Sequence, residues 1–133
     1  MGEVKSVSDK VDWVTKRSLC SLPNIFRELG IQVEEDIKIR NALRPANSPY
    51  EFSVLENGDG ITVLLKTKDV QKSVTFSLAE HAFVVRDDQG NMLFEVTLTF
   101  SDEGECKMKV NDVERELWQV RRMALEGLLF HAN

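Results

Sequence analysis

The chain has 133 residues, of which 42% are hydrophobic and 29% are charged, and its formal net charge is -5. This length is typical of one domain whose core needs no metal or disulfide to stay folded. The acidic balance lacks the basic surface that nucleic-acid binding needs, and no apolar stretch reaches the length of a membrane span. We therefore expect one soluble domain over residues 1–133, with neither nucleic acid nor membrane as a partner.

The N-terminal residues and the cysteines predict a cytoplasmic protein. No apolar segment of the signal-peptide kind follows Met1. The two cysteines, Cys20 and Cys106, are too few for the disulfide framework of a secreted scaffold. We therefore expect both to be buried free thiols.

A short amphipathic helix is predicted near the N-terminus, ending at about residues 17–19. Either Ser6 or Ser8 can cap its first turn. Its apolar positions Val7, Val11 and Val14 recur at helical spacing, and Trp13 lies beside them.

A second helix is predicted to begin near Ser21. Pro23 suits its first turn, where a missing backbone N–H has no consequence. Gly30 tolerates the left-handed conformation that ends many helices, so we expect the helix to end there. Its buried side is expected to consist of Ile25, Phe26 and Leu29.

Residues 31–40 fit more than one structure. Read with a period of two, apolar residues occupy four of the five positions on one face, with Glu35 as the exception, which favours a strand. Read with a period of 3.6, Val33 and Ile37 align with Arg40 or Asn41, as in a helix. A turn at residues 34–36 is the third alternative, and the strand is the preferred interpretation.

An antiparallel β-meander is predicted over residues 50–110, after an N-terminal helical arm (1–43) and a loop containing Pro45 and Pro49. Apolar and polar residues alternate through six segments, separated by short turns that leave no room for crossover helices. The expected turns are centred on residues 57–60, 68–69, 80–81, 87–90 and 101–104. One face of such a sheet is apolar and must be covered by helices.

A C-terminal helix is predicted over residues 111–131, with Asn111 as its N-cap and Glu114 reaching back to it. Its apolar residues cover an arc wider than a surface helix needs. The central stripe of this arc consists of Val113, Leu117, Val120, Ala124 and Leu128. Trp118, Leu125 and Leu129 widen it on one side, and Met123 and Phe130 lie on another side. The width of the arc indicates either that the helix is held between the sheet and the N-terminal helices or that part of it contacts another subunit.

The sequence contains no recognisable metal-binding or catalytic motif. The candidate metal ligands Cys20, His81, Cys106 and His131 are widely separated, and none forms a paired ligand motif. Neither histidine has an evident nucleophile and carboxylate beside it. We therefore expect no metal, no cofactor and no enzymatic activity.

Arg121 is the residue whose role the sequence leaves open. It carries a permanent charge close to the apolar stripe of the last helix, so it must find carboxylates, carbonyl oxygens or an aromatic ring. An intrachain salt bridge or stacking on Trp118 is one interpretation, and contact with an anionic ligand or partner is the other. The candidate contact residues are Trp118, Arg121, Arg122, Met123 and Phe130.

Together these patterns predict a two-layer α+β fold. It has a six-stranded antiparallel β-meander, seven-stranded if residues 31–40 join it, with N-terminal and C-terminal helices packed on one face. The first functional hypothesis is a non-enzymatic protein-interaction, adaptor or chaperone-like domain that acts as a homodimer. The alternative is a carrier or sensor that binds a small apolar or anionic ligand between the sheet and the C-terminal helix.

Overall fold

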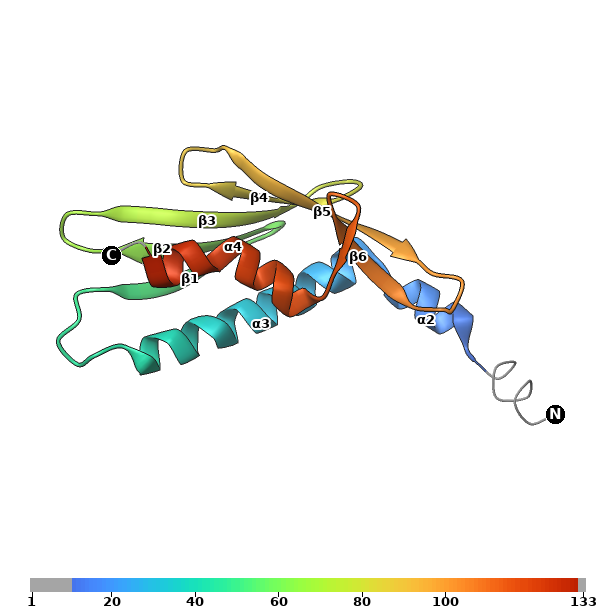
Figure 1. The fold of residues 1–133 in the computed structure, drawn as a ribbon, viewed down its shortest axis with the longest axis horizontal. Coiled ribbons are helices and arrows are strands. Elements are labelled where there is room, and N and C mark those ends of the chain that lie inside the picture. Colours follow the sequence, from blue (N-terminus) through green and yellow to red (C-terminus); the bar gives the residue numbers. More distant parts are fainter. Residues whose placement is uncertain (1–10, 132–133) are drawn as a thin grey trace.

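The computed structural model describes residues 11–131, which form three helices and one seven-stranded antiparallel sheet (Figure 1). The predicted α+β fold is confirmed. The helices are α2 (Trp13–Leu19), α3 (Leu22–Leu43) and α4 (Leu117–His131). The strands are β1 (Glu51–Asn57), β2 (Gly60–Lys66), β3 (Gln71–Leu78), β4 (Phe83–Asp87), β5 (Met92–Phe100), β6 (Cys106–Val110) and β7 (Val113–Arg115).

The sheet is a simple meander in which each strand pairs with the next one along the chain. The register places Val63 between Val54 and Val74, so apolar residues of neighbouring strands share one face. Glycines at positive φ allow the tight turns at Gly58, Gly90 and Gly104. The predicted β-meander is therefore confirmed, with a bulge between Val85 and Arg86.

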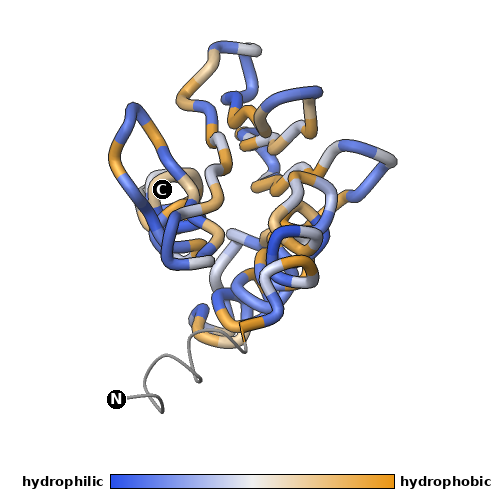
Figure 2. The backbone as a smooth tube through the Cα atoms, turned by 90° about the vertical axis from the view of Figure 1, so that its right-hand side faces the viewer, coloured by the Kyte–Doolittle hydropathy of each residue, from blue (hydrophilic) through white to orange (hydrophobic). Residues whose placement is uncertain are grey.

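The helices α3 and α4 lie against the same face of the sheet (Figure 1). Figure 2 shows the molecule along its long axis, and hydrophobic and hydrophilic positions alternate along the backbone. The inward positions form one core, in which the rings of Phe26 and Phe83 pack edge to face at 5.9 Å. The core side chains that are most completely buried include Leu29, Val33, Phe76 and Val120.

Helix α3 begins as predicted at Ser21, whose hydroxyl accepts a hydrogen bond from the Asn24 backbone N–H at 3.3 Å. The prediction that the helix ends at Gly30 is wrong. A Cβ on Gly30 would lie 2.6 Å from Glu56 Oε1 and 3.3 Å from Ile61 Cδ1. Gly30 therefore allows close approach of the helix to the sheet, and the helix continues to Leu43.

The preferred strand interpretation of residues 31–40 is also wrong, because the whole segment is helical. Val33 and Ile37 are buried with Leu29 at helical spacing, whereas Ile31 and Ile39 are exposed. The alternating pattern arose because two isoleucines face solvent on the other sides of the helix.

The C-terminal helix begins later than predicted. Asn111 and Asp112 have φ of 51° and 64° and form a two-residue turn between β6 and β7, so Asn111 is not a helix cap. Strand β7, rather than residues 31–40, supplies the seventh strand. At the true start of α4, the Gln119 side chain accepts a hydrogen bond from the Glu116 backbone N–H at 2.8 Å.

The N-terminal helix and the cysteines also depart from expectation. Ser6 and Ser8 lie outside the described residues, and the described helix α2 is capped by Asp12. Cys20 and Cys106 form a disulfide, with a Cα–Cα distance of 5.3 Å, so the prediction of free thiols is wrong. The junction between α2 and α3 lies beside the first residue of β6, which brings the two cysteines within bonding reach.

Candidate functional site

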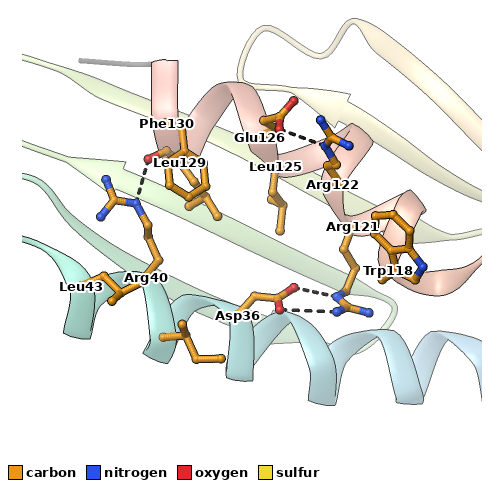
Figure 3. A pocket seen from close by; sticks show the side chains of 11 residues that line it. Asp36, Arg40, Leu43, Trp118, Arg121, Arg122, Leu125, Glu126, Leu129 and Phe130 are labelled. Carbon is orange, nitrogen blue, oxygen red and sulfur yellow. Dashed lines mark hydrogen bonds and ion pairs between the residues drawn. The ribbon is translucent and has the colours of Figure 1, made fainter.

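A groove with a volume of about 270 Å³ lies between α3 and α4, on the outer side of the helical layer (Figure 3). Its walls come from segments that are far apart in the sequence. From α3 it takes Asp36, Ile39, Arg40 and Leu43, and from α4 it takes Trp118, Arg121, Arg122, Leu125, Glu126, Leu129 and Phe130.

Large apolar side chains border this groove and are exposed to solvent. The exposed fractions are 51% for Ile39, 71% for Leu43, 50% for Trp118 and 57% for Phe130. Scattered exposed apolar residues are normal on protein surfaces, but a contiguous group around a concave site is typical of an interaction surface. We call these four residues the apolar rim.

An ion pair connects the two helices across the groove. Arg121 Nε donates to Asp36 Oδ2 at 2.6 Å (Figure 3). Arg121 also donates to the side-chain oxygen of Gln32. The side chains of Arg121 and Asp36 are only 16% and 29% exposed. A partly buried guanidinium needs a carboxylate, so the salt-bridge interpretation of Arg121 is confirmed.

Arg40 makes a second connection, which the sequence did not predict. Its Nε donates to the backbone carbonyl of Leu129 at 3.0 Å, in the last turns of α4. Its guanidinium lies over the rings of Phe52 and Phe130, at 5.5 Å and 4.9 Å from their centroids. The only signal in the sequence was the helical spacing of Arg40 with Val33 and Ile37.

The structure brings four of the five predicted contact residues to the groove. Arg122 forms an exposed ion pair with Glu126 at 2.9 Å, and the Trp118 indole N–H donates to the Glu116 carboxylate at 2.8 Å. Met123 does not line this groove. It lines a neighbouring depression with Arg115, Gln119 and Gly127, on another side of α4.

The other candidate residues of the sequence do not assemble into a site. His81 is exposed, with its Nε2 3.7 Å from a Glu80 carboxylate oxygen, and the side chain of His131 lies outside the described part. Within residues 11–131, no three His, Cys, Asp or Glu side chains are placed to hold a metal ion. The described chain also contains no helix long and apolar enough to cross a membrane.

The groove is suited to contact rather than to acid–base chemistry. Both of its carboxylates, Asp36 and Glu126, are engaged in ion pairs with arginines. The rest of its lining is apolar or cationic. The chain matches no protein family, no curated protein and no solved structure.

Proposed function

We propose that this chain is a non-enzymatic protein-interaction domain that acts as a homodimer through the face formed by α3 and α4. The observation that carries the proposal is the apolar rim of Ile39, Leu43, Trp118 and Phe130 around the groove. Covering these side chains with a protein surface removes them from water, which is the main favourable term in association.

The charges of this face suit a second copy of the same chain. A twofold interface places the same patch on both subunits, so it must be complementary to itself. The α3–α4 face carries both signs, with the exposed Arg122 and Glu126 beside the apolar rim. A neighbouring copy can therefore exchange partners across the axis, the arginine of one subunit facing the glutamate of the other.

The test is the subunit number of wild-type protein and two matched variants, measured by sedimentation equilibrium. Leu43→Glu places a charge on the apolar rim, and Leu55→Glu places the same charge on an exposed leucine of β1 outside the rim. We expect wild type and Leu55→Glu to be dimers and Leu43→Glu to be a folded monomer. A monomeric wild type, or dimers of all three proteins, would contradict the proposal.

A small-ligand carrier is the second candidate, with the groove between α3 and α4 as its site in place of the predicted space between the sheet and the C-terminal helix. The groove places the half-exposed ring of Trp118 beside Arg121, where an anionic aromatic or lipid-like molecule can stack on the ring and compete with Asp36 for the guanidinium. Its volume of about 270 Å³ is slightly below the common range for ligand pockets. Native mass spectrometry separates the candidates, because a monomer that retains extra mass supports the carrier and a bare dimer supports the interaction domain.

The further predictions, that the protein is cytoplasmic and acts as an adaptor or chaperone-like domain, remain part of this proposal. A disulfide is uncommon in the cytoplasm, where it is usually transient, catalytic or redox-sensing. The Cys20–Cys106 bond therefore needs an explanation of its own.

A further inference from the structure

The Cys20–Cys106 disulfide joins two segments at the edge of the fold. Cys20 is the residue that follows α2, and Cys106 is the first residue of β6. Both lie outside the continuous core that α3, α4 and the sheet form. The bond therefore fastens the N-terminal helix to the β5–β6 hairpin rather than holding the core together.

Among residues 11–131, few other contacts hold α2 in place. The helix buries none of its own side chains, and Trp13, Val14 and Leu19 are all exposed. Its polar contacts in the described chain are local, such as Thr15 with Asp12 and Arg17 with the carbonyl oxygen of Cys20. Opening the disulfide would therefore release α2 without removing a buried apolar contact made by the helix.

The two sulfur positions differ in access. Cys20 is buried, whereas Cys106 is exposed and lines an open groove of about 730 Å³. This groove is formed by α2, the β5–β6 hairpin and the segment that leads into α4, and Cys20 does not line it. The exposure of residue 106 and its place in the groove lining favour attack by an incoming thiolate on Cys106, with the buried Cys20 as the leaving group.

The surroundings of Cys20 can also accommodate its reduced thiol. The Cys20 sulfur lies 3.7 Å from the backbone carbonyl oxygen of Thr99. In the disulfide this sulfur carries no hydrogen, but the reduced thiol can donate a hydrogen bond to that carbonyl. Reduction therefore leaves no isolated polar group at this position.

We propose that Cys20–Cys106 is a thiol–disulfide exchange site at which a thiol reductant releases α2. The reductant thiolate attacks Cys106 Sγ, the Cys20–Cys106 bond breaks, and Cys20 leaves as a thiolate that takes a proton from water. A second reductant thiolate attacks the reductant sulfur of the mixed disulfide. This forms the oxidised reductant and frees Cys106, which is protonated in turn, so two electrons pass to the protein.

The first experiment maps the site of attack in the native, oxidised protein. Reduced glutathione is added, the reaction is quenched with acid and alkylating agent, and the glutathione adducts are located by peptide mass spectrometry. We expect the adduct on Cys106 in roughly tenfold excess over Cys20, as attack on the accessible sulfur requires. Adduct mainly on Cys20, no reaction without denaturant, or two free thiols in protein purified without reductant would each overturn the proposal.

The second experiment asks what reduction changes, using a thioredoxin-type dithiol protein as well as glutathione. In a Trp118→Phe background, Trp13 on α2 is the remaining tryptophan and reports on that helix alone. We expect the fluorescence anisotropy of Trp13 to fall on reduction. The β-sheet signal in the far-ultraviolet circular dichroism spectrum should stay unchanged. Unchanged anisotropy, or unfolding of the sheet, would overturn the proposal. The comparison of the two reductants shows whether a small peptide or a protein is the faster donor.

The Cys20→Ser and Cys106→Ser variants serve as controls, because neither can form the bond. Both are expected to show the low anisotropy of the reduced protein before any reductant is added. The position of the glutathione adduct does not depend on the subunit number. The anisotropy is compared before and after reduction within the same Trp118→Phe protein, whose subunit number is measured in both states, so failure of the homodimer proposal and failure of this one are distinguishable.

Discussion

Asp36 and Arg121 show at the level of single residues how the two helices are held together. Their ion pair joins positions 85 residues apart in the sequence and is largely shielded from water. Removing one partner from such a pair leaves an uncompensated charge in a poorly solvated place, which is more harmful than the loss of an exposed pair.

We therefore predict that Asp36→Asn lowers the free energy of unfolding by roughly 1–3 kcal/mol. Urea denaturation followed by circular dichroism measures this loss. The matched control is Glu126→Gln, which removes the exposed pair with Arg122 within α4. Its expected effect is about 0.5 kcal/mol or less. Equal losses in the two variants would show that burial of the first pair has no energetic consequence.

Glu56 is a second residue with a testable environment. Partial desolvation raises the pKa of its carboxyl group, and the neighbouring Glu34 raises the same pKa further by repulsion and hydrogen bonding. The folded state therefore holds this proton more tightly than the unfolded state. The ionised carboxylate disfavours folding at neutral pH, and this penalty disappears as the pH falls through the raised pKa.

Glu56→Gln is accordingly predicted to raise the free energy of unfolding at pH 7. The gain should vanish at a pH below 4.5, the ordinary pKa of the group, where the wild-type carboxyl is protonated in both states. Unfolding titrations at several pH values measure the difference. Glu34→Gln should give part of the same gain, and the two changes should not add, since each removes the same repulsion. A gain that is independent of pH would refute the electrostatic explanation.

At this scale the sequence predicted some contacts and not others. A guanidinium near an apolar stripe must be paired, so the bonded state of Arg121 followed from its position alone. The partner Asp36 did not, because its helix was interpreted as a strand. The disulfide was missed because two cysteines are too few to indicate a disulfide framework, and their sequence separation does not tell whether they meet in space.

At the level of secondary-structure elements, α3 shows where local signals mislead. Gly30 is a common helix terminator, yet here it lies where β1 and β2 approach the helix too closely for a side chain. Ile31 and Ile39 completed an alternating pattern although both face solvent. Tertiary packing of Leu29, Val33 and Ile37 decided the structure of this segment, and local propensity did not.

The two-residue turn between β6 and β7 can be tested by substitution. Asn111 and Asp112 both have positive φ, which asparagine and aspartate tolerate and glycine adopts without strain. We predict that Asp112→Gly raises the free energy of unfolding by up to about 1 kcal/mol, whereas Asn111→Val lowers it by about 1–2 kcal/mol. Thermal and urea unfolding both measure these changes.

Asp88→Gly is the matched control for this turn, because the same substitution is made at a residue outside the positive-φ group. Glycine there only adds freedom to the unfolded chain, so a small loss of stability is expected. If Asp112→Gly and Asp88→Gly lower the free energy of unfolding alike, the left-handed conformation at Asp112 does not affect the stability of the protein.

For the whole molecule, the sheet was the most predictable part. Alternating residues and glycine-rich turns determine a meander with little ambiguity, because every strand pairs with its sequence neighbour. The groove was not predictable in the same way. It depends on the relative placement of α3 and α4, which no local pattern specifies. Of the apolar arc expected on the last helix, Trp118, Met123 and Phe130 are exposed in the structure, and the contact of this arc with another subunit stays a prediction.

The strand order also has a consequence for synthesis on the ribosome. All seven strands precede α4, and the contacts of α4 with α3 join distant parts of the sequence, as in the bond from Arg40 to Leu129 across 89 residues. A nascent chain can therefore complete its hairpins one after another while part of its apolar face still lacks a cover. That part stays open until α4 has left the exit tunnel, which makes the interval before α4 emerges the time at which the sheet is most exposed to aggregation.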